Sequence, residues 1–217
     1  KPINTPYDLN ISTFLSMGYK LGATPFRINT GVNGSYGYGF NTVNTIETTT
    51  QKYNATGSVR LEYRLDNLFE ASARVRYGYN KTHYQLTSDF DQTNITQTYT
   101  VDATYQMKYG FTLSSSISID RFLGLSSGYN STIPIWNAYL AKTVFKNKKG
   151  EIRFAANDLL NQNVGISRTT DINYVEDTRA LSLARYFLLS FTYTLNKVST
   201  NEMNPMRGMG GMGRRMF

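Results

Sequence analysis

The sequence predicts an all-β protein and, more narrowly, a transmembrane antiparallel β-barrel to which this chain contributes about nine strands. Three observations predict it. Apolar and polar residues alternate along nearly every segment, the polar rows are rich in Ser, Thr, Asn and Arg, and short and long connections alternate. Between Phe26 and Phe40 the alternation outlasts an ordinary soluble strand of about 5–6 residues and suffices for a membrane strand of about 9–11.

The first four predicted strands alternate most strictly. They cover residues 9–21, 26–40, 53–65 and 69–80. In the first, Leu15 and Met17 share one face, and Ser16 and Lys20 share the other. The third and fourth place Leu, Val, Ala and Tyr on one face and charged side chains on the other. One face of each strand therefore suits lipid and the other suits water.

The remaining predicted strands cover residues 98–107, 111–120 and 133–145, a strand beginning at Ile152, and residues 187–195. Four of these keep the alternation. The segment 133–145 does not, because Trp136 shares a side with Lys142 while Tyr139 shares one with Asn137. A bulge, or a face covered by protein, would explain the mixed polarity.

The connections sort by length. Short links with Gly, Pro, Asn or Asp are predicted at 22–25, 66–68, 108–110 and 147–150, and longer polar links at 41–51, 87–95, 123–132 and 159–184. Outer-membrane barrels have short periplasmic turns and long extracellular loops, so the Met/Gly/Arg-rich tail 196–217 is expected in the periplasm. Because bacterial single-chain barrels have even strand numbers, an odd count predicts that residues 1–195 are the C-terminal part of a larger barrel.

Composition narrows the function classes. The chain has no Cys, which excludes disulfides and thiolate sites. The net charge of +8 is dispersed along the chain, so no nucleic-acid surface is predicted. A soluble β-sandwich or barrel is the alternative fold, because such sheets also favour Tyr and Phe. The aromatic residues gather near both ends of the predicted strands, which favours the two belts of a membrane barrel.

Charged residues of the third and fourth predicted strands form the candidate site, which we call the arginine wall. Its members share the lumen side: Arg60, Glu62, Arg64, Glu70, Arg74 and Arg76. A tight turn at 66–68 would set Arg64 opposite Glu70 and Arg60 opposite Arg74. Such a wall either attracts anions or forms an ion-pair ladder that stiffens the barrel and docks a plug; we expect the ladder.

No catalytic, metal or cofactor site is predicted. His83 is the only histidine; it lacks a convincing nucleophile and metal-ligating partners, and we expect it in a loop. Acidic residues near the extracellular side match no calcium-binding loop: Asp120, Asp158, Asp171, Glu176 and Asp177. The chain is therefore not expected to be an enzyme.

The C-terminal third carries a more specific signal. It contains Lys-Asn-Lys-Lys-Gly-Glu-Ile-Arg at 146–153, Asn-Asp-Leu-Leu-Asn-Gln-Asn at 157–163, and Arg-Tyr-Phe-Leu-Leu-Ser-Phe-Thr-Tyr-Thr-Leu-Asn-Lys at 185–197. Together with the tail of Met, Gly and Arg, these segments resemble the Bacteroidetes outer-membrane β-barrel family, which is TonB-dependent-receptor-like. The rest of the chain matches that family only in barrel character.

The resemblance implies localisation in a bacterial outer membrane and a barrel for substrate uptake or gating. It implies as partners the lipid bilayer with its lipopolysaccharide, an N-terminal plug domain that these residues do not include, and the TonB system. The alternative is a non-transporting structural barrel subunit of an outer-membrane assembly or secretion complex, with periplasmic or surface partner proteins.

Overall fold

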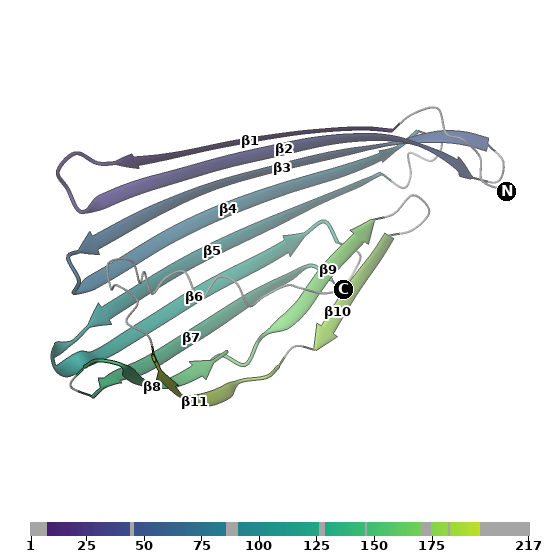
Figure 1. Ribbon diagram of the computed structural model, residues 1–217. Coiled ribbons are helices and arrows are strands. Elements are labelled where there is room, and N and C mark those ends of the chain that lie inside the picture. The colour runs from purple at the N-terminus through teal and green to yellow at the C-terminus, as the bar shows by residue number, and fades with distance from the viewer. Residues whose placement is uncertain are drawn as a thin grey trace.

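The structure, a computed structural model, describes residues 8–43, 46–85, 91–125, 129–145, 147–170, 175–181 and 183–195 (Figure 1). The strands of this part are β1 (Leu9–Lys20), β2 (Phe26–Val43), β3 (Ile46–Leu65), β4 (Phe69–Tyr84), β5 (Gln92–Gln106), β6 (Phe111–Leu123), β7 (Ser131–Val144), β8 (Gly150–Asn157), β9 (Val164–Thr170), β10 (Val175–Leu181) and β11 (Tyr186–Tyr193). One helical turn, η2 (Lys108–Gly110), precedes β6. No helix of the described residues is long and apolar enough to cross a membrane.

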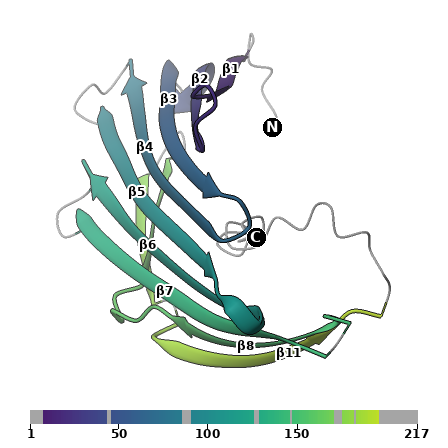
Figure 2. The same cartoon turned by 90° about the vertical axis from the view of Figure 1, so that its left-hand side faces the viewer.

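Nine strands form one antiparallel sheet in the order β1-β2-β3-β4-β5-β6-β7-β8-β11, and β9 and β10 pair separately. The prediction of an all-β antiparallel chain is confirmed. The nine-stranded sheet is open, with β1 and β11 at its edges, and is not closed into a barrel. It curves strongly across its width (Figure 2). The links that follow β1, β3, β5 and β7 lie at one end of the strands, and those that follow β2, β4 and β6 lie at the other (Figure 1). The predicted sorting by length fails between β2 and β3, because β2 ends at Val43 and β3 begins at Ile46.

The nine-stranded sheet has two chemically different faces, because its register joins like residues from strand to strand. One cross-strand row is apolar: Tyr19, Ile28, Leu61, Ala73, Val101, Ile117 and Trp136. The neighbouring row on the other face is polar: Lys20, Arg27, Glu62, Ser72, Asp102, Ser116 and Asn137. We call these the apolar face and the polar face.

The apolar face lacks a covering layer in the described part of the chain. Leu15 is 72% exposed and Val101 is 56% exposed, whereas Ser72 on the polar face is 4% exposed. Other exposed members of the apolar face are Met17, Tyr19, Val32, Val59, Leu61, Val75, Leu113, Ile117, Leu140, Phe154 and Leu189. A contiguous apolar surface of this extent is rare on soluble monomers and marks contact with a partner or a membrane.

Two segments predicted as loops are partly strands. β2 and β3 extend to Val43 and Ile46, so the segment 41–51 continues the hairpin. The segment 159–184 contains the β9–β10 hairpin. Thr-rich, β-branched sequence favours both extensions, but polar residues at successive positions hide the period of two. The loop prediction was therefore wrong at these positions.

β7 is confirmed as a strand, and its mixed polarity has a local cause. Its pairing with β6 runs without interruption from Phe111–Lys142 to Phe122–Ser131, so no bulge interrupts it. Ile133, Tyr139 and Ala141 are buried on the polar face of the sheet. Of the two explanations that the sequence leaves open, the covered face is the one observed.

Two glycines provide a matched test of this backbone. Gly124 has a φ of 76°, and a Cβ there would lie 2.1 Å from the carbonyl oxygen of Thr93. We expect Gly124→Ala to destabilise the fold by about 1–3 kcal/mol, because it adds a backbone clash to a left-handed conformation. At Gly57 a Cβ would meet no atom within 4 Å, so Gly57→Ala should be neutral or mildly stabilising. Unfolding midpoints from circular dichroism measure both; equal midpoints would contradict this geometry.

Candidate functional site

The turn between β3 and β4 fixes the geometry of the arginine wall. Asp66 takes a φ of 44°, and the Leu68 amide donates to the Leu65 carbonyl at 3.0 Å. This tight turn sets Arg64 opposite Glu70 and Arg60 opposite Arg74, as the sequence predicts. Every member of the wall therefore lies on the polar face of two neighbouring strands.

Two ion pairs form within the wall. Arg60 Nε lies 3.1 Å from Glu62 Oε1, and Arg64 Nε lies 2.8 Å from Glu70 Oε1. The second carboxylate oxygen of Glu70, Oε2, is buried and has no hydrogen-bond partner among the described residues. Because these pairs are half-exposed, each contributes little to stability by itself. Their main effect is to hold the guanidinium groups in place.

The wall continues into a hydrogen-bonded network that the sequence analysis missed. Arg60 Nη2 donates to Ser72 Oγ at 3.1 Å, and Ser72 donates to Asp102 Oδ2 at 3.2 Å. Ser116 donates to the other oxygen of Asp102 at 2.6 Å. The network therefore crosses β3, β4, β5 and β6. Its sequence signal is Asp102, which has the polar parity of its strand, but only the register places it beside Ser72.

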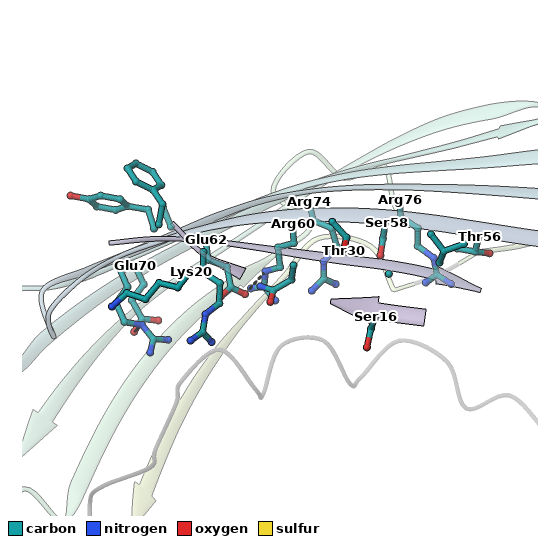
Figure 3. A pocket seen from close by; sticks show the side chains of 18 of the residues that line it. Ser16, Lys20, Thr30, Thr56, Ser58, Arg60, Glu62, Glu70, Arg74 and Arg76 are labelled. Carbon is teal, nitrogen blue, oxygen red and sulfur yellow. Dashed lines mark ion pairs between the residues drawn. The ribbon is translucent and has the colours of Figure 1, made fainter. Parts of the chain in front are cut away.

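Arg74 and Arg76 form no ion pair with the described residues. Both are exposed on the polar face, and Arg74 lies near the positive charges of Arg60 and Arg76 as well as the carboxylate of Asp102. Figure 3 shows both side chains on the same side of the sheet as Arg60, Glu62 and Glu70. A cavity of about 870 Å³ opens here, lined mainly by β1, β2, β3 and β4.

The Asn-Asp-Leu-Leu-Asn-Gln-Asn motif at residues 157–163 forms a tightly hydrogen-bonded turn, which we call the Asn157 turn. Asp158 is 3% exposed; its carboxylate accepts hydrogen bonds from the amides of Gln162 at 3.1 Å and Asn163 at 3.0 Å. Asn137 Oδ1 accepts from the Asp158 amide at 2.8 Å, which ties the turn to β7.

The same turn also holds the entry to the last strand. Asn161 Oδ1 accepts from the amide of Arg185 at 2.9 Å, and the Arg185 guanidinium donates to the Leu159 carbonyl at 3.2 Å. These bonds span the β9–β10 hairpin and close its base. The motif therefore has a structural role here, joining β7, β8 and the start of β11.

The single histidine lies in a strand, so its prediction as a loop residue was wrong. β4 extends to Tyr84, and His83 Nδ1 lies 2.6 Å from Asp91 Oδ2. Burial raises the pKa of Asp91, but hydrogen bonds from His83 and from the Tyr84 amide, with the charges of His83 and Lys81, outweigh burial and hold that pKa below its ordinary value. The pair fastens β4 to the start of β5.

Of the acidic residues considered above, Glu176 and Asp177 follow one another on β10. Asp120 accepts a hydrogen bond from Thr98 at 2.6 Å, Asp158 belongs to the Asn157 turn, and Asp171 lies outside the described residues. Among the residues that the structure describes, no group of three or more His, Asp and Glu side chains could hold a metal ion. The tail 196–217 also lies outside this part.

Comparison of the chain with family models, curated proteins and solved structures finds no match.

The Asn157 turn generates a testable prediction. Asp158→Asn replaces one acceptor oxygen with an NH₂ group that faces a backbone N–H, so the turn should lose about 1–3 kcal/mol of stability. We expect trypsin to cleave the segment between Leu159 and Arg185 several-fold faster than in the unsubstituted protein. Glu151→Gln, a matched change in an exposed ion pair on β8, should leave this rate unchanged. Equal cleavage of both variants and the parent would show that Asp158 does not hold the turn.

The His83–Asp91 pair generates a pH prediction. A carboxylate whose folded pKa is depressed adds stability that is present above its ordinary value and lost as pH falls through the folded pKa. Protection of the Tyr84 amide, which donates to Asp91 Oδ1 at 2.9 Å, should therefore fall as pH drops below about 4. Hydrogen exchange of the Tyr84 amide, corrected for its intrinsic rate at each pH, measures this protection. In Asp91→Asn the pH dependence should vanish; its persistence would exclude Asp91 as its source.

Proposed function

We propose that this chain forms part of the wall of a transmembrane antiparallel β-barrel in a bacterial outer membrane. The observation that carries the proposal is the uncovered apolar face of the single-layer, nine-stranded sheet. In water such a sheet needs a second layer to cover that face. In a bilayer the lipid covers it, and the polar face lines the lumen.

Strand length and aromatic placement support the membrane. β1 to β7 are 12 to 20 residues long, which exceeds the about 9–11 residues that cross the hydrocarbon core. Near the short turns, the ring centroids of Phe26 and Tyr63 lie 4.9 Å apart. Towards the other end, those of Tyr36 and Tyr53 lie 5.1 Å apart. Two aromatic groups separated along the strands suit the two membrane interfaces.

The open edges support a larger barrel. The backbone groups at the outer edges of β1 and β11 have no partner strand in the nine-stranded sheet. An unpaired backbone group costs several kcal/mol in hydrocarbon, so a membrane sheet must pair both edges with further strands. The curvature of the sheet in Figure 2 brings the two edges towards one another and leaves the polar face on the inside.

We further propose that this barrel is TonB-dependent-receptor-like and takes up or gates a substrate. The arginine wall and the Asp102 network would line the path or contact a plug domain, and the longer connections would contact ligand at the cell surface. The short turns and the tail 196–217 would face the periplasm, where the TonB system acts.

One observation favours the alternative, a non-transporting structural subunit of an outer-membrane assembly or secretion complex. Around β7 the polar face carries the buried residues Ile133, Tyr139 and Ala141, which an aqueous path does not require. Gentle purification distinguishes the two functions. Companions in fixed stoichiometry support the structural subunit, and a lone barrel that retains ligand uptake supports transport.

A charge on the apolar face tests the membrane directly. Val101 lies mid-strand and is 56% exposed, so an arginine there is harmless if the face meets water. If the face meets lipid, Val101→Arg should destabilise the folded barrel by about 2–4 kcal/mol. The measurement is the urea midpoint of folding into lipid vesicles. Ser118→Arg on the polar face is the control and should fold normally. If Val101→Arg has the same urea midpoint as the unsubstituted protein, the apolar face does not meet lipid and the proposal is wrong.

A further inference from the structure

We propose that the cavity at the arginine wall binds a soluble ligand that carries more than one phosphate or sulfate group. This inference rests on the proposed function, since it names the substrate class of the same lumen surface. Most of the residues that line the cavity, and all of its charged ones, belong to the polar face rather than to the face assigned to lipid, so its ligand comes from solution rather than from a lipid headgroup.

The charge balance of the cavity favours an anion. Six cationic side chains and two carboxylates line it, an excess of four positive charges. The cations are Lys20, Arg27, Arg60, Arg64, Arg74 and Arg76, and the carboxylates are Glu62 and Glu70. Charges of one sign inside a concave, low-dielectric surface focus the field and concentrate ions of the opposite sign.

The ion pairs use both carboxylates and leave two guanidinium groups available. Glu62 pairs with Arg60, and Glu70 pairs with Arg64. Arg74 stands directly opposite Arg60, and like charges at opposed positions destabilise a sheet unless an anion lies between them. Arg74 and Arg76 form no ion pair with the described residues, so an oxyanion would relieve this repulsion and gain bidentate hydrogen bonds.

The cavity geometry indicates where the ligand binds and that it is multivalent. The bare oxygen of Glu70 repels anions near the short turn, which places the binding groups towards Arg74 and Arg76. These two arginines are two residues apart on one strand, and their Cα atoms are separated by about 7 Å. Two oxyanion groups on one molecule span that separation. The volume of about 870 Å³ accommodates such a ligand together with its carrier.

Calorimetric titration of the full-length protein, purified in lipid-free detergent, tests the proposal with tripolyphosphate as the probe. We expect saturable binding that weakens with salt, and weaker binding of monophosphate. Arg74→Gln/Arg76→Gln should lower the affinity for tripolyphosphate by about tenfold or more. Arg121→Gln removes one positive charge outside this cavity, as each single variant at 74 or 76 does inside it, and should leave the affinity unchanged. If the double variant does not fold, the two single variants decide.

The inference is overturned if the folded protein does not bind tripolyphosphate, or if Arg121→Gln weakens binding as much as Arg74→Gln or Arg76→Gln does. If protein recovered from lipid vesicles no longer binds tripolyphosphate, a lipid headgroup occupies the cavity. That result would also overturn the inference. The proposed function has a separate readout in the folding of Val101→Arg into vesicles. A barrel that inserts normally but binds no polyanion would overturn this inference and leave the proposed function intact.

Discussion

The structure depends on one constraint: the antiparallel hydrogen-bond ladder keeps residues of the same parity on the same face across nine strands. A slip of one residue between any two strands would move every later side chain to the other face. The tight turns prevent such a slip, as at Asp66 between β3 and β4. A single layer can therefore present an apolar surface and a polar surface of equal extent.

The same ladder organises the chemistry of the polar face. The row from Lys20 to Asn137 crosses β1 to β7 and contains the Ser72–Asp102–Ser116 hydrogen bonds. Asn137 is the last residue of this row. Its Oδ1 accepts a hydrogen bond from the Asp158 amide, which attaches the Asn157 turn to the row. Register thus connects the arginine wall with the Asn157 turn.

The arginines of the wall differ in whether they form ion pairs. The arginines of β3, Arg60 and Arg64, face carboxylates and form the expected ladder. Those of β4 towards the middle of the strand, Arg74 and Arg76, do not. Paired and unpaired arginines are therefore neighbours within one wall, and the ion pairs hold the guanidinium groups of Arg60 and Arg64 beside the cavity.

The sequence by itself determined the two-faced strands, the short turns and the Arg64–Glu70 pairing, because these follow from parity and local turn chemistry. It misplaced the polar segments 41–51 and 159–184, where no apolar period marks a strand. Only the tertiary structure decided the covered face of β7, the place of Asp102 beside Ser72, and the lack of ion-pair partners for Arg74 and Arg76 in the described part of the chain. Each of these depends on contacts between strands distant in sequence, and the residues of a single strand do not encode them.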